Sequence, residues 1–320
     1  MSAEVPAVSV VTPTYNRADR AERLLDALAR LEPPPGGFEV LVVDNGSVDD
    51  TTERLRARAV TSPFPLRPQR VQVNHGPARA RNLGWQEAAA PLVAYIDDDC
   101  IPDPGWLAAG VRRLGSDPEL GVVQGRTCMP PEFDGQVLSS WTVRRDITGP
   151  TVHFEGCNVF YRREALAATG GFDEEIGWWG EDAAAGWGVV EAGWLRGFEP
   201  DAVVTHDVEV RNLVWHVKNH YLERNLVRVA AKHPRFREAY FWQPWAAQKE
   251  TAALTIGVAG LLASRWWRPA ALAIVPYLWL ARPSVRQPDF FRNGARTVLF
   301  DSARAAGHLA GSVRARTLVL

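Results

Sequence analysis

Cysteine, lysine and long apolar runs are scarce in this sequence. The three cysteines, Cys100, Cys128 and Cys157, are odd in number and widely spaced, so they predict neither a disulfide framework nor a zinc site and favour a reducing compartment. Lysine supplies only three of the 36 basic residues, so arginine carries nearly all of the positive charge. The total charge of −1 argues against a general nucleic-acid-binding surface. No cationic segment precedes an apolar one in the first residues, so we expect no secretory signal there.

The C-terminal part differs from the rest in charge and in pattern. Residues 264–320 contain nine arginines and two aspartates, which gives them +7 and leaves −8 for residues 1–263. Two apolar runs, Thr251–Ala263 and Ala270–Ala281, flank Arg265–Arg268, and each is shorter than the ~20 residues of a spanning helix. The paired tryptophans between arginines favour a helical hairpin at an anionic membrane interface. The alternative is two core helices of a small bundle, or a dimer interface.

Three adjacent carboxylates follow the most strand-like run of the chain. Leu92–Ile96 is short and apolar, and it leads directly into Asp97, Asp98 and Asp99. Such a run predicts a buried strand of a parallel sheet, and ligands bind at the carboxyl ends of these strands. Adjacent acids repel one another unless a cation is present, and oxygen ligands suit Mg²⁺ or Mn²⁺ bound to nucleotide phosphates. The alternative is a solvated acidic turn in which Asp103 caps the next helix.

Expected strands and helices alternate along the chain. The expected strands are Val8–Val11, Phe38–Val43, Val71–Val73, Leu92–Ile96 and Ala202–Thr205, and the expected helices include Ala21–Leu31, Thr51–Val60, Ala183–Ala192 and Leu213–Ala231. This alternation predicts an α/β fold with a mostly parallel sheet, flanked by helices and joined by right-handed crossovers. The polar clusters fall at one edge of that sheet.

Four short motifs lie at this expected edge. They are Thr12–Arg17, Val42–Ser47, Gly76–Gly84 and Tyr95–Asp99. In this order and at this spacing they resemble the family 2 glycosyltransferases, and four ordered motifs are far more specific than one aspartate tripeptide. The resemblance covers roughly residues 8 to 230. It implies the GT-A fold, a nucleotide-binding α/β domain. We therefore expect a catalytic domain at 1–235, with a donor half at 1–126 and an acceptor half at 127–235, and a helical appendage at 236–320.

The resemblance also implies a site for the nucleotide. The base pocket would consist of Pro13, Tyr15, Arg17 and Asp44. Asp44 would accept a hydrogen bond from an imide N–H of the base, which favours a UDP-sugar or a dTDP-sugar as donor. Arg79 and Asn82 would lie near the ribose or the phosphates. From the residues alone, either Arg79 or Arg81 near the start of a helix could meet a pyrophosphate, and a solvated helix face is the alternative for each.

The metal site would follow directly after the central strand. By the same resemblance, Asp97 and Asp99 form the DxD pair that holds Mn²⁺ or Mg²⁺, and Asp98 faces the ribose. Family members often carry a further acid at the next position, where this chain has Cys100. His206, after its own expected strand, would complete the metal shell, although a lone histidine at a strand end is more often structural.

The second half would supply the acceptor site. The resemblance places Gly156 and Asn158 beneath the donor sugar. Glu181 and Asp182 fall in the first turn of an expected helix, where the helix dipole favours carboxylates whether or not they react. In the family such a Glu–Asp pair is catalytic, so Asp182 is the expected general base, with Glu181 beside it. Trp178 and Trp179 would form a wall for sugar stacking, although core packing is the commoner role of tryptophan.

These expectations describe one enzyme. It would be a metal-dependent, inverting glycosyltransferase that moves a sugar from a nucleotide-sugar to a hydroxyl of a glycan or lipid-linked acceptor in cell-envelope or polysaccharide synthesis. Its location would be cytoplasmic, at the inner face of the membrane. One alternative is a nucleotidyltransferase of related fold, which would want a glycine-rich, lysine-bearing loop after its first strand. The other is a catalytically silent sugar-binding protein, which would not need both Asp99 and Asp182.

Overall fold

The computed structural model of the chain describes residues 5–136, 138–139, 141–282 and 290–320. Contacts divide it into two compact units, Met1–Val210 (unit 1) and Arg211–Leu320 (unit 2), each of which is described by itself. The division falls at 210/211, whereas the sequence led us to expect a functional boundary at 235/236. It falls earlier because α7 (Leu213–Leu222) and α8 (Arg224–Lys232) pack against α12 (Phe290–Ala315) of the helical part.

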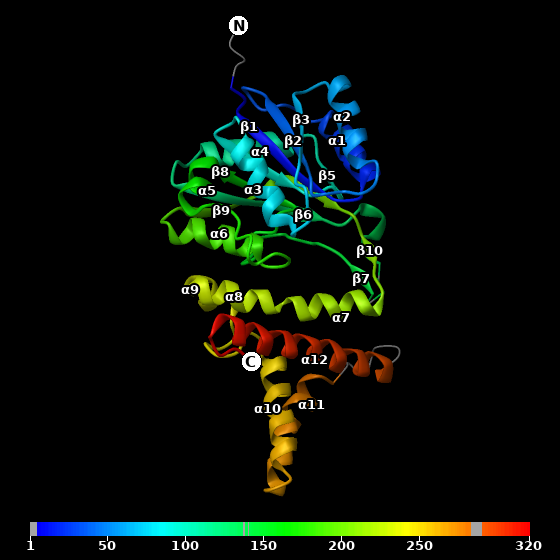
Figure 1. Cartoon of the computed structure of the whole chain (residues 1–320), viewed down its shortest axis with the longest axis vertical. Helices are drawn as coiled ribbons and strands as arrows, with labels where there is room; N and C mark the ends of the chain where they lie inside the picture. The colour runs from blue at the N-terminus through cyan, green and yellow to red at the C-terminus, as the bar shows by residue number, and fades with distance from the viewer. Residues whose placement is uncertain (1–4, 137, 140, 283–289) are drawn as a thin grey trace. The chain divides into compact units, whose positions relative to one another are not determined.

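Unit 1 is built on one mixed sheet of eight strands in the order β3-β2-β1-β4-β8-β6-β9-β5 (Figure 1). The strands of unit 1, including a separate β7–β10 pair, are β1 (Val8–Thr14), β2 (Phe38–Asp44), β3 (Leu66–Arg70), β4 (Leu92–Ile96), β5 (Cys100–Pro102), β6 (Leu120–Cys128), β7 (Thr142–Val143), β8 (Asn158–Arg162), β9 (Leu195–His206) and β10 (Glu209–Val210). Its helices are α1 (Ala18–Leu28), α2 (Thr51–Thr61), α3 (Pro77–Glu87), α4 (Trp106–Gly115), η1 (Pro131–Phe133), α5 (Arg163–Thr169) and α6 (Glu181–Glu191).

The pairing of the strands brings the expected motifs to one edge. β3, β2, β1 and β4 are parallel neighbours, so Thr14, Asp44 and the acids after Ile96 all lie at carboxyl ends. β8 runs antiparallel to both β4 and β6, which makes the sheet mixed beyond β4. The expected α/β fold with flanking helices is confirmed, and the parallel part of the sheet is the half that carries the expected nucleotide motifs.

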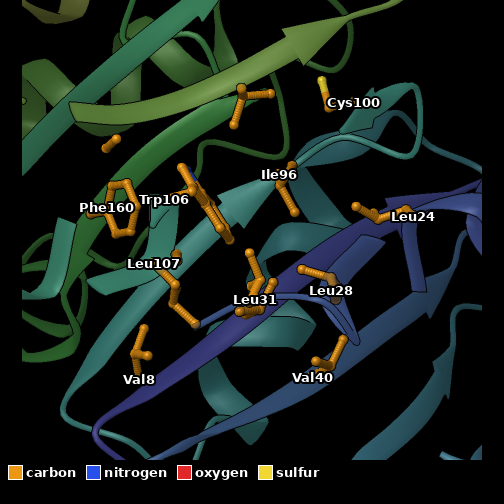
Figure 2. Close-up of a cluster of buried hydrophobic side chains, with 14 of the residues drawn as sticks. Val8, Leu24, Leu28, Leu31, Val40, Ile96, Cys100, Trp106, Leu107 and Phe160 are labelled. Carbon is orange, nitrogen blue, oxygen red and sulfur yellow. The ribbon is translucent and has the colours of Figure 1, made fainter. Parts of the chain in front are cut away.

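Apolar periodicity explains how the helices cover this sheet. Leu24, Leu25 and Leu28 recur at helical spacing on α1 and are fully buried. They join strand residues such as Val8 and Val40 in the main core, which Figure 2 shows in close-up. Burying a leucine contributes roughly 1.5–3 kcal/mol. The polar edge is therefore supported by a rigid apolar layer.

The prediction of a strand at Val71–Val73 is wrong. The third strand is β3, Leu66–Arg70, which pairs in parallel with β2 from Val40 to Asp44. Pro68 argues against a strand in sequence-based reasoning, but β3 is an edge strand, where proline's missing N–H costs no ladder hydrogen bond. After Val71 the chain leaves the sheet.

Unit 2 is helical. Its elements are α7 (Leu213–Leu222), α8 (Arg224–Lys232), α9 (Pro234–Tyr240), α10 (Lys249–Ala263), η2 (Arg268–Ile274), α11 (Val275–Leu280) and α12 (Phe290–Ala315). The single helix expected at 213–231 is divided at Glu223, whose carboxylate accepts a hydrogen bond from Nε of Arg304 (2.8 Å). The expected hairpin is present, since α10 packs against η2 and α11 (Figure 1). Among the described residues, no helix combines the length and hydropathy needed to cross a bilayer. Arg286 and Asp289 of the basic tail lie outside the described residues.

Candidate functional site

Each of the three adjacent aspartates meets a different set of partners. Asp98 is buried and accepts hydrogen bonds from Thr14 Oγ1 (2.7 Å) and Arg17 Nη1 (2.9 Å). Burial raises the pKa of Asp98 to about 6, although Arg17 opposes this rise. Asp98 therefore fixes the end of β4 to the loop after β1, and Arg17 belongs to the acidic site.

Asp99 lies among two arginines and a histidine. Its carboxylate is 3.3 Å from Arg17 and 3.2 Å from Arg20 through one oxygen, and 3.5 Å from His206 Nε2 through the other. Cys100 completes a cluster with Asp99 and His206 whose candidate ligand atoms lie within 4.8 Å of one another. Burial raises the pKa of the Cys100 thiol well above its ordinary value, so it stays protonated and is a poor ligand for a hard cation.

The donor set at this corner fits Mg²⁺ or Mn²⁺. The Asp99 carboxylate and the His206 imidazole are suitable first ligands for Mn²⁺, and water and phosphate oxygens commonly complete such a shell. The Nδ1 atom of His206 lies 2.7 Å from the backbone oxygen of Asp207, which orients Nε2 towards Asp99. Asp97 is not in this cluster, because its carboxylate is bound to Arg81. The sequence led us to expect Asp97 and Asp99 as a pair of metal ligands. In the structure Asp97 contacts Arg81, whereas Asp99 contacts Arg17, Arg20 and His206.

Arg81 is the buried centre of the site. Its side chain is 4% exposed and contacts three carboxylates: Asp97 through Nη2 (3.0 Å), and Glu181 (3.0 Å) and Asp182 (2.8 Å) through Nη1. Burial lowers the pKa of the guanidinium, but the surrounding carboxylates outweigh this and raise it. One fixed cation therefore joins the end of β4 to the first turn of α6.

Asp182 has an ion-pair contact on one carboxylate oxygen and a hydrogen bond on the other. Oδ1 faces Arg81, and Oδ2 accepts a hydrogen bond from the backbone N–H of Gly156 (2.8 Å). A Cβ atom at position 156 would lie 2.5 Å from Nη2 of Arg81, so only glycine leaves room for the guanidinium. Burial raises the pKa of Asp182 to about 8; Arg81 opposes this, while Glu181 adds to it. Such a perturbed carboxyl in a polar site is typical of a general base.

The residues expected around the base lie on or next to two loops that are joined by hydrogen bonds. Asn16 Oδ1 accepts from the backbone N–H of Val48 (2.9 Å), which ties the loop after β1 to the loop after β2. Asp44 is buried, and its carboxylate accepts from Ser47 N (2.8 Å), Arg70 Nη1 (3.1 Å) and Thr52 Oγ1. Tyr15, in the loop after β1, is 39% exposed, and Pro13 is half-buried near the end of β1.

Three other expected site residues lie in different surroundings. Arg79 is exposed on α3. Asn82 is buried, and its amide is bound to Phe172 O (2.8 Å) and Glu174 (3.0 Å). Asn158 is fully buried, with its Nδ2 donating to Arg126 O (2.8 Å) and Ala202 O (2.9 Å). The last two amides therefore brace the fold in this structure.

The two tryptophans lie in a strained loop before α6. Trp179 has φ +67°, a left-handed conformation that a bulky residue rarely adopts, and it is flanked by Gly177 (φ +75°) and Gly180 (φ +99°). Trp178 is 51% exposed, and the guanidinium of Arg145 lies 5.9 Å from the Trp179 ring centre. Such strain concentrates at functional sites, which agrees with a ligand-facing loop.

Sequence reasoning missed several members of the site. Arg81 was considered only as a phosphate contact, and Thr14, Arg20 and Arg70 were not considered. Arg81 and Thr14 lie inside motifs and Arg20 follows one by three residues, so these positions could have been found, whereas Arg70 ends the strand that was misplaced. The partner of Arg81 could not, because Glu181 is one hundred residues away from Arg81.

Residues 9–170, half of the chain, match the family model described as glycosyl transferase family 2. The chain belongs to this family. Validoxylamine A glucosyltransferase of Streptomyces hygroscopicus subsp. limoneus is 29% identical over 290 residues, which cover 75% of this chain and 60% of the relative. Glycosyltransferase AglE of Haloferax volcanii is 28% identical over 186 residues, which cover 55% of this chain and 59% of the relative.

A solved structure resembles this family 2 member over nearly its whole length. The mannosyltransferase of Pyrobaculum calidifontis, solved in complex with GDP-Man and Mn²⁺, has a TM-score of 0.65 and 25% identity, covering 95% of this chain and 87% of its own. The fold is therefore of the GT-A type, and the family match favours glycosyl transfer over nucleotidyl transfer. The chain spans about three-fifths of the length of the two named curated relatives.

Proposed function

We propose that this family 2 member is a metal-dependent, inverting glycosyltransferase that uses a nucleotide-sugar donor. The observation that carries the proposal is the shared guanidinium of Arg81. It lies 3.0 Å from Asp97, beside the expected metal site, and 2.8 Å from Asp182, the expected base. Donor and acceptor chemistry would then meet around one fixed charge.

The donor would lie along the carboxyl edge of the sheet. The base would enter between Tyr15 and the Asp44 loop, and the diphosphate would approach Asp99. Asp99 and His206, with Asp97 nearby, would hold Mn²⁺ or Mg²⁺, and the bound ion would supply Lewis-acid stabilisation of the charge on the departing diphosphate. Arg17 and Arg20, which contact Asp99, would then be available to meet phosphate oxygens.

The acceptor would lose its proton to Asp182. As the acceptor oxygen forms a bond to the anomeric carbon, the bond from that carbon to the diphosphate breaks, and the hydroxyl proton moves to the carboxylate. A well-placed base contributes ~10²–10⁴-fold to such a step. One base and one displacement give inversion. Glu181 would keep Arg81 in place, and Trp178 and Trp179 would contact a sugar ring.

The identity of the donor is the first property to test. Asp44 would accept a hydrogen bond from the imide N–H of a uracil or thymine base, in addition to those from Ser47, Thr52 and Arg70. This makes UDP- and dTDP-sugars the favoured donors. A GDP-sugar is the competing donor, because the Pyrobaculum calidifontis protein was solved with GDP-Man. A donor screen with Mn²⁺ that follows release of UDP, dTDP or GDP by slow hydrolysis would decide. The proposal fails if no nucleoside diphosphate is released from any donor, with or without metal.

The acceptor would be a glycan or a lipid-linked sugar in cell-envelope or polysaccharide synthesis. The support is the basic, apolar character of the last part of the chain, where residues 264–320 carry a net +7. An anionic membrane surface at the inner face of the cell membrane would attract such a segment.

A further inference from the structure

A hairpin in unit 2 carries large apolar side chains on its outer surface. It consists of α10, the turn at 264–267, η2 and α11. Exposed fractions are 64% for Leu262, 83% for Trp266, 67% for Trp267, 59% for Leu278 and 64% for Trp279. Single exposed apolar residues are normal, but five large ones on one hairpin indicate an interaction surface.

The two arms of the hairpin pack closely against each other. A Cβ added to Gly260 would lie 2.5 Å from the backbone oxygen of Ala270, so the two arms approach closely through small residues and direct their large ones outwards. At its base, Leu254 and Tyr277 pack with Ala305 of α12. The Tyr277 hydroxyl also donates to Asp301 (3.2 Å). The base is therefore anchored in unit 2.

Beyond Lys249 and Glu250 in the first turn of α10, the charges of the hairpin and of the residue that follows α11 are positive and lie at its two ends. Between Glu250 and Arg282 the only charged residues are Arg265 and Arg268, both at the turn. At the turn, the guanidinium of Arg265 lies 5.8 Å from the ring centre of Trp266, and at the other end that of Arg282 lies 3.6 Å from Trp279. Tryptophan with arginine at both ends of an apolar stretch is the pattern of residues that sit at lipid headgroups.

We propose that this hairpin docks into an anionic lipid bilayer, with its apolar middle in the acyl region and its Arg–Trp pairs at headgroup level. The proposal specifies which segment would bind the membrane that the proposed function includes. It rests on the proposed function only for the identity of the acceptor that the docked enzyme would glycosylate. The helix α10 has 15 residues, or about 22 Å, which is shorter than the ~30 Å hydrocarbon layer. Because α10 is too short to span the bilayer, we expect the hairpin to dock from one face of the membrane.

Charge argues against a second copy of the chain as the occupant. A two-fold contact through the hairpin would bring its arginines close to one another. No acidic residue lies between Glu250 and Arg282 to neutralise them. Anionic lipid supplies the missing negative charge and accepts the apolar side chains as well.

The test is sedimentation of the purified full chain with lipid vesicles. Vesicles of phosphatidylcholine and phosphatidylglycerol at 7:3 should carry the wild-type protein down, and lipids brominated in their acyl chains should quench its tryptophan fluorescence. The triple variant Leu262→Glu, Trp266→Ser, Trp267→Ser should lose at least tenfold in partitioning and most of the quenching. Arg265→Gln with Arg268→Gln should reduce partitioning roughly fivefold per arginine on these vesicles, and have little effect on pure phosphatidylcholine.

The matched control is Val60→Glu, an equally drastic change at a valine that is 85% exposed on α2 of unit 1. It should bind vesicles as the wild type does. Circular dichroism and donor hydrolysis confirm that each variant is folded, and vesicle binding does not depend on either the donor or catalysis. Three results would overturn the proposal: no vesicle binding by the wild type, full binding by the triple variant, or a dimer in light scattering that the triple variant converts to monomer.

Discussion

Nη1 of Arg81 lies 2.8 Å from Oδ1 of Asp182. The Arg81 side chain is 4% exposed and that of Asp182 is 20% exposed, and the same guanidinium reaches Asp97 through its other nitrogen. A cation in this position sets the orientation of the expected base and limits the rise of its pKa. We therefore expect Arg81 to position groups of both halves of the proposed site.

Replacing Arg81 should damage stability and transfer together. Arg81→Met leaves the buried Glu181 and the partly exposed Asp97 and Asp182 without their cation. This should cost about 3 kcal/mol in the free energy of unfolding, the lower end of the range for breaking a buried ion pair. Arg81→Lys keeps the charge but lacks the two separated nitrogens with which Arg81 contacts Asp97 on one side and Glu181 and Asp182 on the other. We therefore expect a smaller loss of stability and a fall in kcat of roughly 100-fold. Denaturant titration and transfer kinetics measure the two effects.

The control for Arg81 is Arg67→Met. Arg67 forms an ion pair with Glu39 at 3.0 Å, and its side chain is 37% exposed. The buried Glu39 also accepts hydrogen bonds from Ser9 Oγ and the backbone N–H of Ala89, which the substitution leaves in place. We expect a loss of about 1 kcal/mol or less and unchanged transfer. Equal effects of the two methionine substitutions would show that Arg81 has no special role.

Gly156→Ala should impair transfer by crowding Arg81. The added methyl would lie 2.5 Å from Nη2, so either the guanidinium or the Gly156 N–H that holds Asp182 must move. A shift of about 1 Å at a catalytic group costs roughly 100-fold in rate. Gly149→Ala is the matched control, because no described atom lies within 4 Å of the added Cβ there. Wild-type kcat in Gly156→Ala would contradict this arrangement.

Asp182→Asn should abolish transfer and leave donor binding largely intact. In the wild type the carboxyl must be ionised to accept the proton, and its pKa is raised to about 8. The acceptor kcat/KM should therefore rise with pH towards that value. An ordinary aspartate, with a pKa of 3.8, would give a flat profile above pH 6. Near-wild-type turnover in Asp182→Asn would rule out Asp182 as the base.

The buried His308 predicts a loss of stability in mild acid. Burial lowers its pKa from 6.5 to about 4. Between these values the unfolded chain binds a proton that the folded chain does not, so the free energy of unfolding should fall as pH falls, by at most ~1.4 kcal/mol per pH unit. His308→Leu should flatten this slope in denaturant titrations from pH 7 to pH 4. An unchanged slope would mean that other groups control acid stability.

Local pattern was enough to predict much of the fold. The positions of β1, β2 and β4 follow from short apolar runs, and their carboxyl ends share one edge because parallel strands must align in that way. β3 was misplaced because Pro68 hides an edge strand. The partners of Arg81 and Asn82 were beyond reach, since each pairing crosses about 90–100 residues and depends on how the sheet closes. Burial then decides which polar residues brace the fold, as in Asn158.

The account depends on a divalent cation at the carboxyl end of β4. The most direct measurement is anomalous diffraction from crystals grown with Mn²⁺ and UDP. The predicted result is a manganese peak within coordination distance of Asp99 and His206, with the diphosphate beside it, and loss of the peak in Asp99→Ala crystals. A manganese peak elsewhere, or UDP bound in full with no manganese near Asp99, would contradict the account.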